Sequence, residues 1–239
     1  AAVLVIAGPR HALASGERES IQAYLKERGR ALILFDPNPQ PWVRQLLAEW
    51  GMDVADGTLV DPASHVAPNS DNILVPRARN SVGLAETYFP GAAAVIPRKT
   101  QSQSFELSAL VWTSPEARLG ENAAADRGAP GAGGQSSGSG LAIGALVSTA
   151  GGAARLIAIG DSDFASNAHF RNGSNSELFL TAVNWLAAGQ QIISVDRKVL
   201  ATRSLLLTPE QARFLHVSSI ALLPLLVLAA GGFVWWRRR

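Results

Sequence analysis

The feature that most constrains this chain is an uninterrupted apolar run near its C-terminal end. Residues 217–236 read VSSIALLPLLVLAAGGFVWW, 20 residues without a charged side chain. At about 1.5 Å per residue, a helix of that length covers ~30 Å, the thickness of the hydrocarbon core of a bilayer. The sequence therefore predicts a transmembrane helix over residues 217–236. The alternative is a buried helix of a protein core, but core helices rarely hold so long an uncharged stretch.

The residues that end this run are typical of a membrane interface. Trp235 and Trp236 would lie among lipid headgroups, and Arg237, Arg238 and Arg239 would follow as a basic anchor. Four basic residues also occur in the 20 positions before the run, so a count alone does not fix the orientation. Because the three arginines adjoin the run directly, we expect a cytoplasmic tail at 237–239. The lipid bilayer is then one partner, and the remaining domain lies outside the inner (cytoplasmic) membrane.

The N-terminal part of the chain has the pattern of an α/β domain. Val3–Ala7 is a continuous apolar run, as in a strand buried on both faces, and Ala31–Phe35 is a second one. Between them, Ile21, Tyr24 and Leu25 repeat at helical spacing. This order predicts a βαβ unit with parallel strands.

Later segments continue the alternation of strands and helices. Leu141–Val147 and Arg155–Ile159 have the composition of strands, and Ser174 to Glu177 has the S-x-x-E form of a capping box before an amphipathic helix. The sequence therefore predicts a doubly wound, mostly parallel, Rossmann-like sheet with helices on both faces. We expect this α/β domain to span residues 1–196 and a juxtamembrane linker to span residues 197–216.

One segment inside the domain is too poor in large side chains to pack. Of the 21 residues from 120 to 140, 16 are Gly, Ala, Ser or Pro. Such a composition buries too little apolar surface to offset the entropy of ordering. We expect residues 120–140 to form a mobile loop within the domain.

Composition excludes several functional classes. The chain has no cysteine, which removes disulfides, thiolate metal sites and thiol nucleophiles. The net charge of +2 becomes −1 without the three terminal arginines, so we expect no nucleic-acid partner. No P-loop and no G-x-S-x-G elbow occur, and the four histidines show no metal-binding spacing. We therefore expect no catalytic residue, no metal and no cofactor.

Polar residues that follow two predicted strands are the candidate ligand-binding residues. Asp36 follows the second strand, and Asp161, Ser162 and Asp163 follow the strand at 155–159. In open α/β sheets, ligands bind beyond the carboxyl ends of the strands. These residues would serve as a divalent-cation site, a sugar-hydroxyl site or a general base. In the alternative, which we favour, Asp161 and Asp163 bond to their own turn and cap the next segment.

Several segments together resemble one family. They are the N-terminal run VLVIAGPRHALASGERESIQAYLKERGRALILFDP, WTSPEA at 112–117, IGDSDFASN at 159–167, ELFLTAVNWLA at 177–187, and the C-terminal LTPEQARFLHVSSIALLPLLVLAAGGFVWWRRR. In order and spacing they resemble the auxiliary subunits of ABC-type transport systems related to the gliding-motility proteins. The resemblance implies a bacterial periplasmic domain with a sheet like those of glutamine amidotransferases and intraflagellar transport proteins. It also implies an ABC permease and a separate ATPase as partners, and it assigns no catalytic residue.

Three hypotheses about function follow. The first is a non-enzymatic, membrane-anchored auxiliary subunit of an ABC-type transport system that binds a partner protein or a ligand outside the membrane. The second is an anchored carbohydrate-active or metal-dependent hydrolase that uses Asp36, Asp161 and Asp163. The third is a structural envelope protein. We favour the first, because the sequence contains no cysteine, no G-x-S-x-G elbow and no P-loop.

Overall fold

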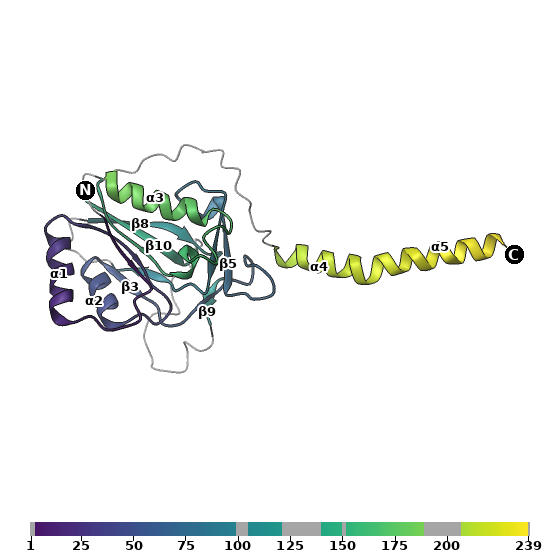
Figure 1. Cartoon of the computed structure of the whole chain (residues 1–239), viewed down its shortest axis with the longest axis horizontal. Coiled ribbons are helices and arrows are strands. Elements are labelled where there is room, and N and C mark those ends of the chain that lie inside the picture. The colour runs from purple at the N-terminus through teal and green to yellow at the C-terminus, as the bar shows by residue number, and fades with distance from the viewer. Residues whose placement is uncertain (1–2, 99–104, 121–139, 150–151, 189–206, 239) are drawn as a thin grey trace.

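The computed structural model consists of an α/β domain and a helical arm that extends from it (Figure 1). It describes residues 3–98, 105–120, 140–149, 152–188 and 207–238. Nearly all of the predicted loop at 120–140, residues 197–206 of the predicted linker, and Arg239 lie outside the described residues.

A five-stranded sheet forms the centre of the domain. Its strands lie in the order β1–β2–β11–β10–β8. Their bounds are Val3–Ala7 (β1), Arg30–Leu34 (β2), Ala154–Ile159 (β11), Ala142–Thr149 (β10) and Phe105–Trp112 (β8). The strands β1, β2 and β11 run parallel, whereas β10 is antiparallel to both β11 and β8. The predicted parallel pairing of the first two strands is therefore confirmed.

The prediction of a doubly wound, mostly parallel, Rossmann-like sheet is wrong, because the sheet is mixed. The reason lies in a short connection. Only residues 150–153 separate β10 from β11, whereas a parallel crossover requires a dozen residues or more. The two strands consequently form a hairpin, and β8 pairs antiparallel with the outer side of β10.

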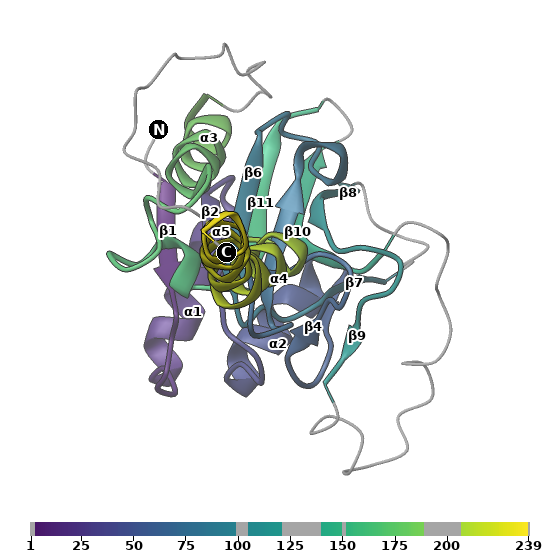
Figure 2. The ribbon, with the colours of Figure 1, turned by 90° about the vertical axis from the view of Figure 1, so that its right-hand side faces the viewer.

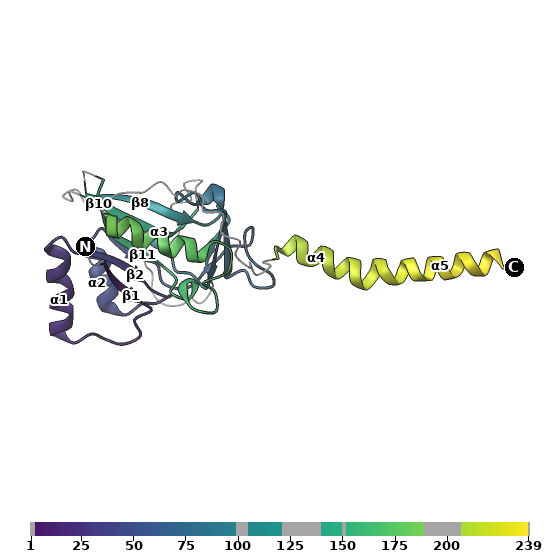
Figure 3. The ribbon, with the colours of Figure 1, turned by 45° about the horizontal axis from the view of Figure 1, so that its top comes forward.

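Both faces of the sheet are covered. Helices α1 (Ser15–Lys26) and α2 (Pro41–Glu49) pack on one face, and α3 (Asn175–Ala188) packs on the other (Figure 3). Successive side chains of a strand point to opposite faces. Ile33 and Phe35 accordingly join the core beneath α1 and α2, while Leu32 and Leu34 join the core beneath α3.

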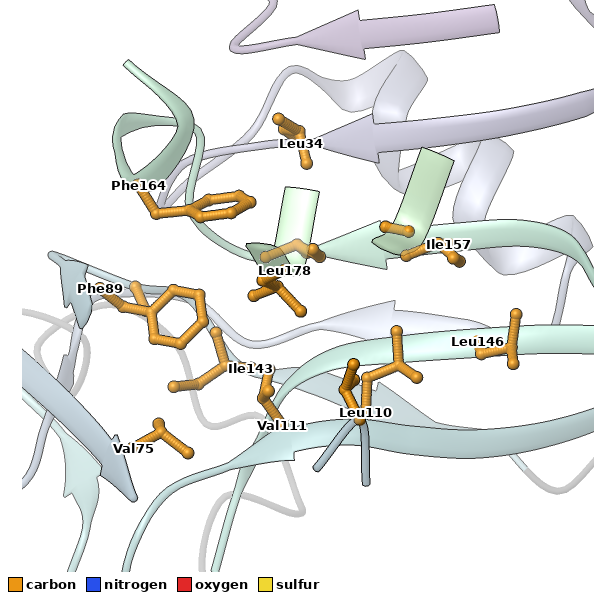
Figure 4. Packing of buried hydrophobic residues seen from close by; sticks show 14 of the residues in the cluster. Leu34, Val75, Phe89, Leu110, Val111, Ile143, Leu146, Ile157, Phe164 and Leu178 are labelled. Atoms are coloured by element: carbon orange, nitrogen blue, oxygen red, sulfur yellow. The ribbon is translucent and has the colours of Figure 1, made fainter. Parts of the chain in front are cut away.

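The core beneath α3 extends past the sheet to the far end of the domain (Figure 4). There Phe89 and Phe164 lie with their ring centroids 5.6 Å apart. Two short antiparallel pairs frame this end, β4 (Leu59–Val60) with β9 (Arg118–Leu119) and β5 (Asn72–Pro76) with β6 (Glu86–Pro90). A third pair, β3 (Met52–Val54) with β7 (Val95–Pro97), adds Met52, Val54 and Val95 to the core beneath α1 and α2. A 3₁₀ turn, η1 (Arg77–Arg79), follows β5.

The helical arm has three consecutive pieces. Helix α4 (Pro209–Val217) is followed by a π-helical segment, η4 (Ser218–Leu222), and by α5 (Leu223–Arg237). Helix α4 starts with a formed capping box, in which the Thr208 hydroxyl accepts from the Gln211 amide and the Gln211 side chain accepts from the Thr208 amide.

The predicted transmembrane helix at 217–236 is wrong. Among the described residues, no helix is both long and apolar enough to cross a membrane. The π-helical segment interrupts the apolar run, and the 15 residues of α5 cover about 22 Å, short of the ~30 Å of a bilayer core. The anchor role of Trp235, Trp236, Arg237, Arg238 and Arg239, and the location in the inner membrane with the domain outside, depended on that span. The structure does not support them.

Candidate functional site

The predicted site residues lie at the carboxyl-end edge of the three parallel strands. Asp36 comes two residues after β2, and Asp161 comes two residues after β11. Because β2 and β11 are parallel neighbours, their ends meet at the same edge. The Phe35 amide donates to the Ile159 carbonyl at 3.0 Å, which holds the two ends together just before the aspartates.

Asp36 and Ser162 are in direct contact. The Ser162 backbone amide donates to Asp36 Oδ1 at 2.8 Å, and the Ser162 hydroxyl donates to Asp36 Oδ2 at 3.0 Å. Gly8, just after β1, closes the group: a Cβ at this residue would lie 2.7 Å from Ser162 Oγ, and its φ is +53°. Gly8 therefore allows the ends of all three parallel strands to converge on one carboxylate.

Asp161 is buried beneath this contact, with 1% of its surface exposed. Its Oδ1 accepts the backbone amides of Asp163 at 2.7 Å and Phe164 at 3.2 Å, and it thereby caps the 3₁₀ turn η3 (Asp163–Ala165). Its Oδ2 is buried and has no hydrogen-bond partner. The bonds that Asp161 makes are those of a turn-capping residue.

The buried carboxyl of Asp161 has an unusual acidity. Burial raises its pKa from 3.8 to about 8, with a smaller increase from the negative charges of Asp36 and Asp163, although the two backbone amides act in the opposite direction. The carboxyl group is therefore mostly protonated at neutral pH. A neutral carboxyl costs much less to bury than a carboxylate, which fits an oxygen that lacks a partner.

The three aspartates differ in how far a substrate could reach them. Asp163 is exposed, Asp36 is committed to Ser162, and Asp161 is too deeply buried to contact a substrate. No group of three or more His, Asp or Glu side chains suited to hold a metal ion is found among the described residues. Of the four predicted residues, the structure brings Asp36 and Ser162 into one contact, and it commits Asp161 to the loop that follows.

Sequence reasoning missed the residue that fixes this loop to the domain. Asn175 is fully buried at the start of α3. Its Oδ1 accepts the Tyr88 amide at 2.8 Å, and its Nδ2 donates to the carbonyls of Tyr88, Phe164 and His169 at 2.8, 3.2 and 3.1 Å. The sequence instead predicted a capping box that begins at Ser174. Because Ser174 Oγ is buried without a hydrogen-bond partner, that box does not form. A long-range role of this kind leaves no local pattern.

A second buried polar group lies around Asp61, just after β4. Asp61 accepts the Ser114 hydroxyl at 2.6 Å, the Ser114 amide at 2.8 Å, and the amides of Ala63 and Ser64. The Arg79 guanidinium lies 3.6 Å away. These bonds tie the TSP segment after β8 to the end of the domain, and they leave Asp61 fully occupied with structural contacts.

The arm presents a surface of a different kind. Large apolar side chains are exposed along its length, on α4, on η4 and on α5. They are Phe214, Leu215, Val217, Ile220, Leu225, Val227, Leu228, Phe233, Val234, Trp235 and Trp236. Monomeric soluble proteins rarely expose so large a contiguous apolar surface, and a helix that is apolar all round is normally buried.

Comparison with known proteins adds evidence on the fold. No protein-family model matches the chain, and no curated protein matches it. Among solved structures, the chain is similar to one described as the mmIFT52 N-terminal domain, with a TM-score of 0.57 and 17% sequence identity. The alignment covers 82% of this chain and 79% of that chain. At this identity, the likeness shows a shared fold alone.

Proposed function

We propose that this chain is a non-enzymatic auxiliary subunit of an ABC-type transport system, and that its helical arm binds a partner protein of that system. The permease is the partner we expect in contact with the arm, and ATP hydrolysis belongs to a separate subunit. The family resemblance of the sequence supports the transport assignment, and the exposed surface of the arm supports the binding role.

The observation that carries the proposal is the exposure of the arm. The arm extends away from the domain, so its apolar side chains do not pack into the domain core (Figure 1). Leu228 is 74% exposed and Ile220 is 71% exposed. Burying apolar surface of this extent gains roughly 25 cal/mol per Å², which gives the arm a strong tendency to associate. An apolar helical surface on the partner would bury these side chains.

The domain supports binding better than catalysis. The hydrolase hypothesis requires Asp36, Asp161 and Asp163 to act on a common substrate. Asp161, however, is buried, and its Oδ1 accepts two backbone amides of the loop that follows it. If the chain were a hydrolase that uses these aspartates, Asp161→Asn and Asp163→Asn would each abolish function while the protein still folds. We expect function to survive both substitutions, with a change in stability for Asp161→Asn alone.

The test is a pull-down of the tagged protein from a whole-cell lysate solubilised in mild detergent, with the co-purifying chains identified by mass spectrometry. We expect a multispanning permease and an ATPase in amounts comparable to the tagged chain. Recovery of the tagged chain free of both would overturn the proposal. A tagged, unrelated protein at the same expression level controls for non-specific capture.

A further inference from the structure

Strand β1 forms an open edge of the central sheet (Figure 2). It pairs with β2 on one side, and in the described part of the chain no strand pairs with its other side. Charged residues, prolines and bulges usually protect an edge strand from further pairing. The five residues VLVIA have none of them. Val5, at the centre of the strand, is 42% exposed.

The direction of the free backbone groups follows from one hydrogen bond. The Gly8 amide donates to the Leu34 carbonyl of β2 at 2.9 Å. The backbone amide and carbonyl groups of successive residues point to alternate sides of a strand. Those of Leu4 and Ile6 therefore also point toward β2. Those of Val3, Val5 and Ala7 point away from it. Among the described residues, no backbone hydrogen bond outside the strand pairing reaches Val3, Val5 or Ala7. Within the described part of the chain, three donors and three acceptors of β1 are thus left without a backbone partner.

The two ends of β1 differ in the charges that lie around them. Arg30 lies opposite Val3 in the sheet, and Arg28 and Arg155 lie near Arg30. Arg30 donates to a backbone carbonyl near the C-terminal end of α3, and Arg155 donates to one near the C-terminal end of α1. Neither side chain has a carboxylate partner among the described ion pairs.

At the other end of the strand, Gly8 adjoins Asp36 and Ser162, and Asp163 follows Ser162 and is exposed. The exposed Arg10 lies two residues after Gly8, so this end holds two carboxylates and one basic side chain. An antiparallel neighbour related by a two-fold axis would place each basic end beside an acidic end.

We infer that β1 pairs antiparallel with β1 of a second copy of this chain, across a two-fold axis at Val5, so that the two sheets join into one. In this register Val5 lies opposite Val5 of the second copy, Leu4 lies opposite Ile6, and Val3 lies opposite Ala7. Residues opposite one another share a face, so the apolar side chains of both copies continue the same two layers. This interface is separate from the arm and does not depend on the proposed partner.

The absence of cysteine from the chain makes disulfide trapping a clean test. A hydrogen-bonded antiparallel pair has a Cα–Cα distance of about 5.5 Å, within the range of a disulfide. Val5→Cys in the full chain, oxidised under mild conditions, should therefore give a covalent dimer in most of the protein. Non-reducing electrophoresis measures the fraction of dimer, and reduction should return the monomer.

Two matched variants show whether the dimer is specific. Ala7→Cys lies on the same exposed strand, but in the proposed register two copies of residue 7 lie about 13 Å apart, which no disulfide spans. Leu180→Cys lies on the outer side of α3 and is 55% exposed. We expect at least tenfold less dimer for each than for Val5→Cys. Equal dimer in all three variants would show random collision. No dimer from a folded Val5→Cys protein would show that two copies do not pair through β1 in this register. Either result overturns the inference.

Discussion

At the scale of single residues, the most informative group is the Asp161 carboxyl. It bonds to its own turn through Oδ1, and its Oδ2 has no partner. Burial raises its pKa to about 8, so the folded protein holds a proton that the unfolded chain releases near pH 4. The proton therefore favours folding at low pH, and that contribution is lost as the pH rises from about 4 to about 8.

The pH dependence predicts a specific behaviour for Asp161→Asn. The amide keeps an oxygen for the two backbone amides and does not ionise. Across the window, the wild-type protein should lose about 1.4 kcal/mol of stability per pH unit through this group, and the variant should not. Urea unfolding at pH 5 and pH 8 should show the variant gaining up to about 4 kcal/mol relative to wild type. A difference that stays constant with pH would contradict a raised pKa.

Asn175 predicts the cost of losing a buried polar connection. Asn175→Ala would leave the Tyr88 amide and three carbonyls without their partner. We expect a loss of about 2–4 kcal/mol in the free energy of unfolding. The exposed Asn167, changed to Ala, is the matched control and should change stability by less than about 0.5 kcal/mol. Similar losses for both variants would show that Asn175 has no special role.

At the scale of elements, local patterns predicted well and long-range pairing did not. The apolar runs at β1 and β2 and the helix between them lie next to each other along the chain, and the sequence was sufficient to predict their parallel pairing. The direction of β10 depended on the short connection to β11, which forces a hairpin. Strand β8 is separated from β10 along the chain by residues 113–141, so its place in the sheet is a long-range pairing. Composition identified the apolar run at 217–236 but not the π-helical segment that divides it.

In the candidate site too, the contact between neighbouring strands was predictable and the long-range contacts were not. Asp36 and Ser162 meet because they follow parallel neighbours in the sheet, which a sequence reading anticipates. The contacts of Asn175 with Tyr88 and of Asp61 with Ser114 join segments 87 and 53 residues apart. Such contacts depend on the packed structure, so no spacing rule could indicate them.

The close approach of β11 to a neighbouring loop predicts the effect of two glycine substitutions. At Gly160 a Cβ would overlap the Ala93 carbonyl, whereas at Gly16 in α1 nothing lies within 4 Å. Gly160→Ala should cost at least ~2 kcal/mol, because the loop must move and its 2.5 Å bond from Ala93 to Gly160 weakens. Gly16→Ala should stabilise the protein by ~0.5 kcal/mol through helix propensity. Thermal unfolding of both variants checks the two signs, and a neutral Gly160→Ala would contradict the packing described for this edge.

At the scale of the whole molecule, the two surfaces proposed for association are the helical arm and the β1 edge of the domain. The domain has a filled core and occupied buried polar groups at Asn175 and Asp61, which suit a stable scaffold. The arm has exposed apolar side chains and adds none to the two cores of the domain. Stability therefore rests on the domain, and the proposed association with the transport partner rests on the arm.

The division predicts separable effects of charge in the two parts. Leu228→Asp places a carboxylate on the exposed arm, and Leu180→Asp places one on the exposed side of α3. Neither side chain is buried in the domain, so both variants should unfold within about 0.5 kcal/mol of wild type. Chemical denaturation of each variant measures this, and a large loss for Leu228→Asp would mean that the arm contributes to the domain core.

Binding of the transport partners through the arm is tested by comparing these two variants in the same detergent pull-down. Quantitative mass spectrometry should show at least a tenfold loss of permease and ATPase with Leu228→Asp, and recovery equal to wild type with Leu180→Asp. Equal recovery of both partners with both variants would contradict binding through the arm.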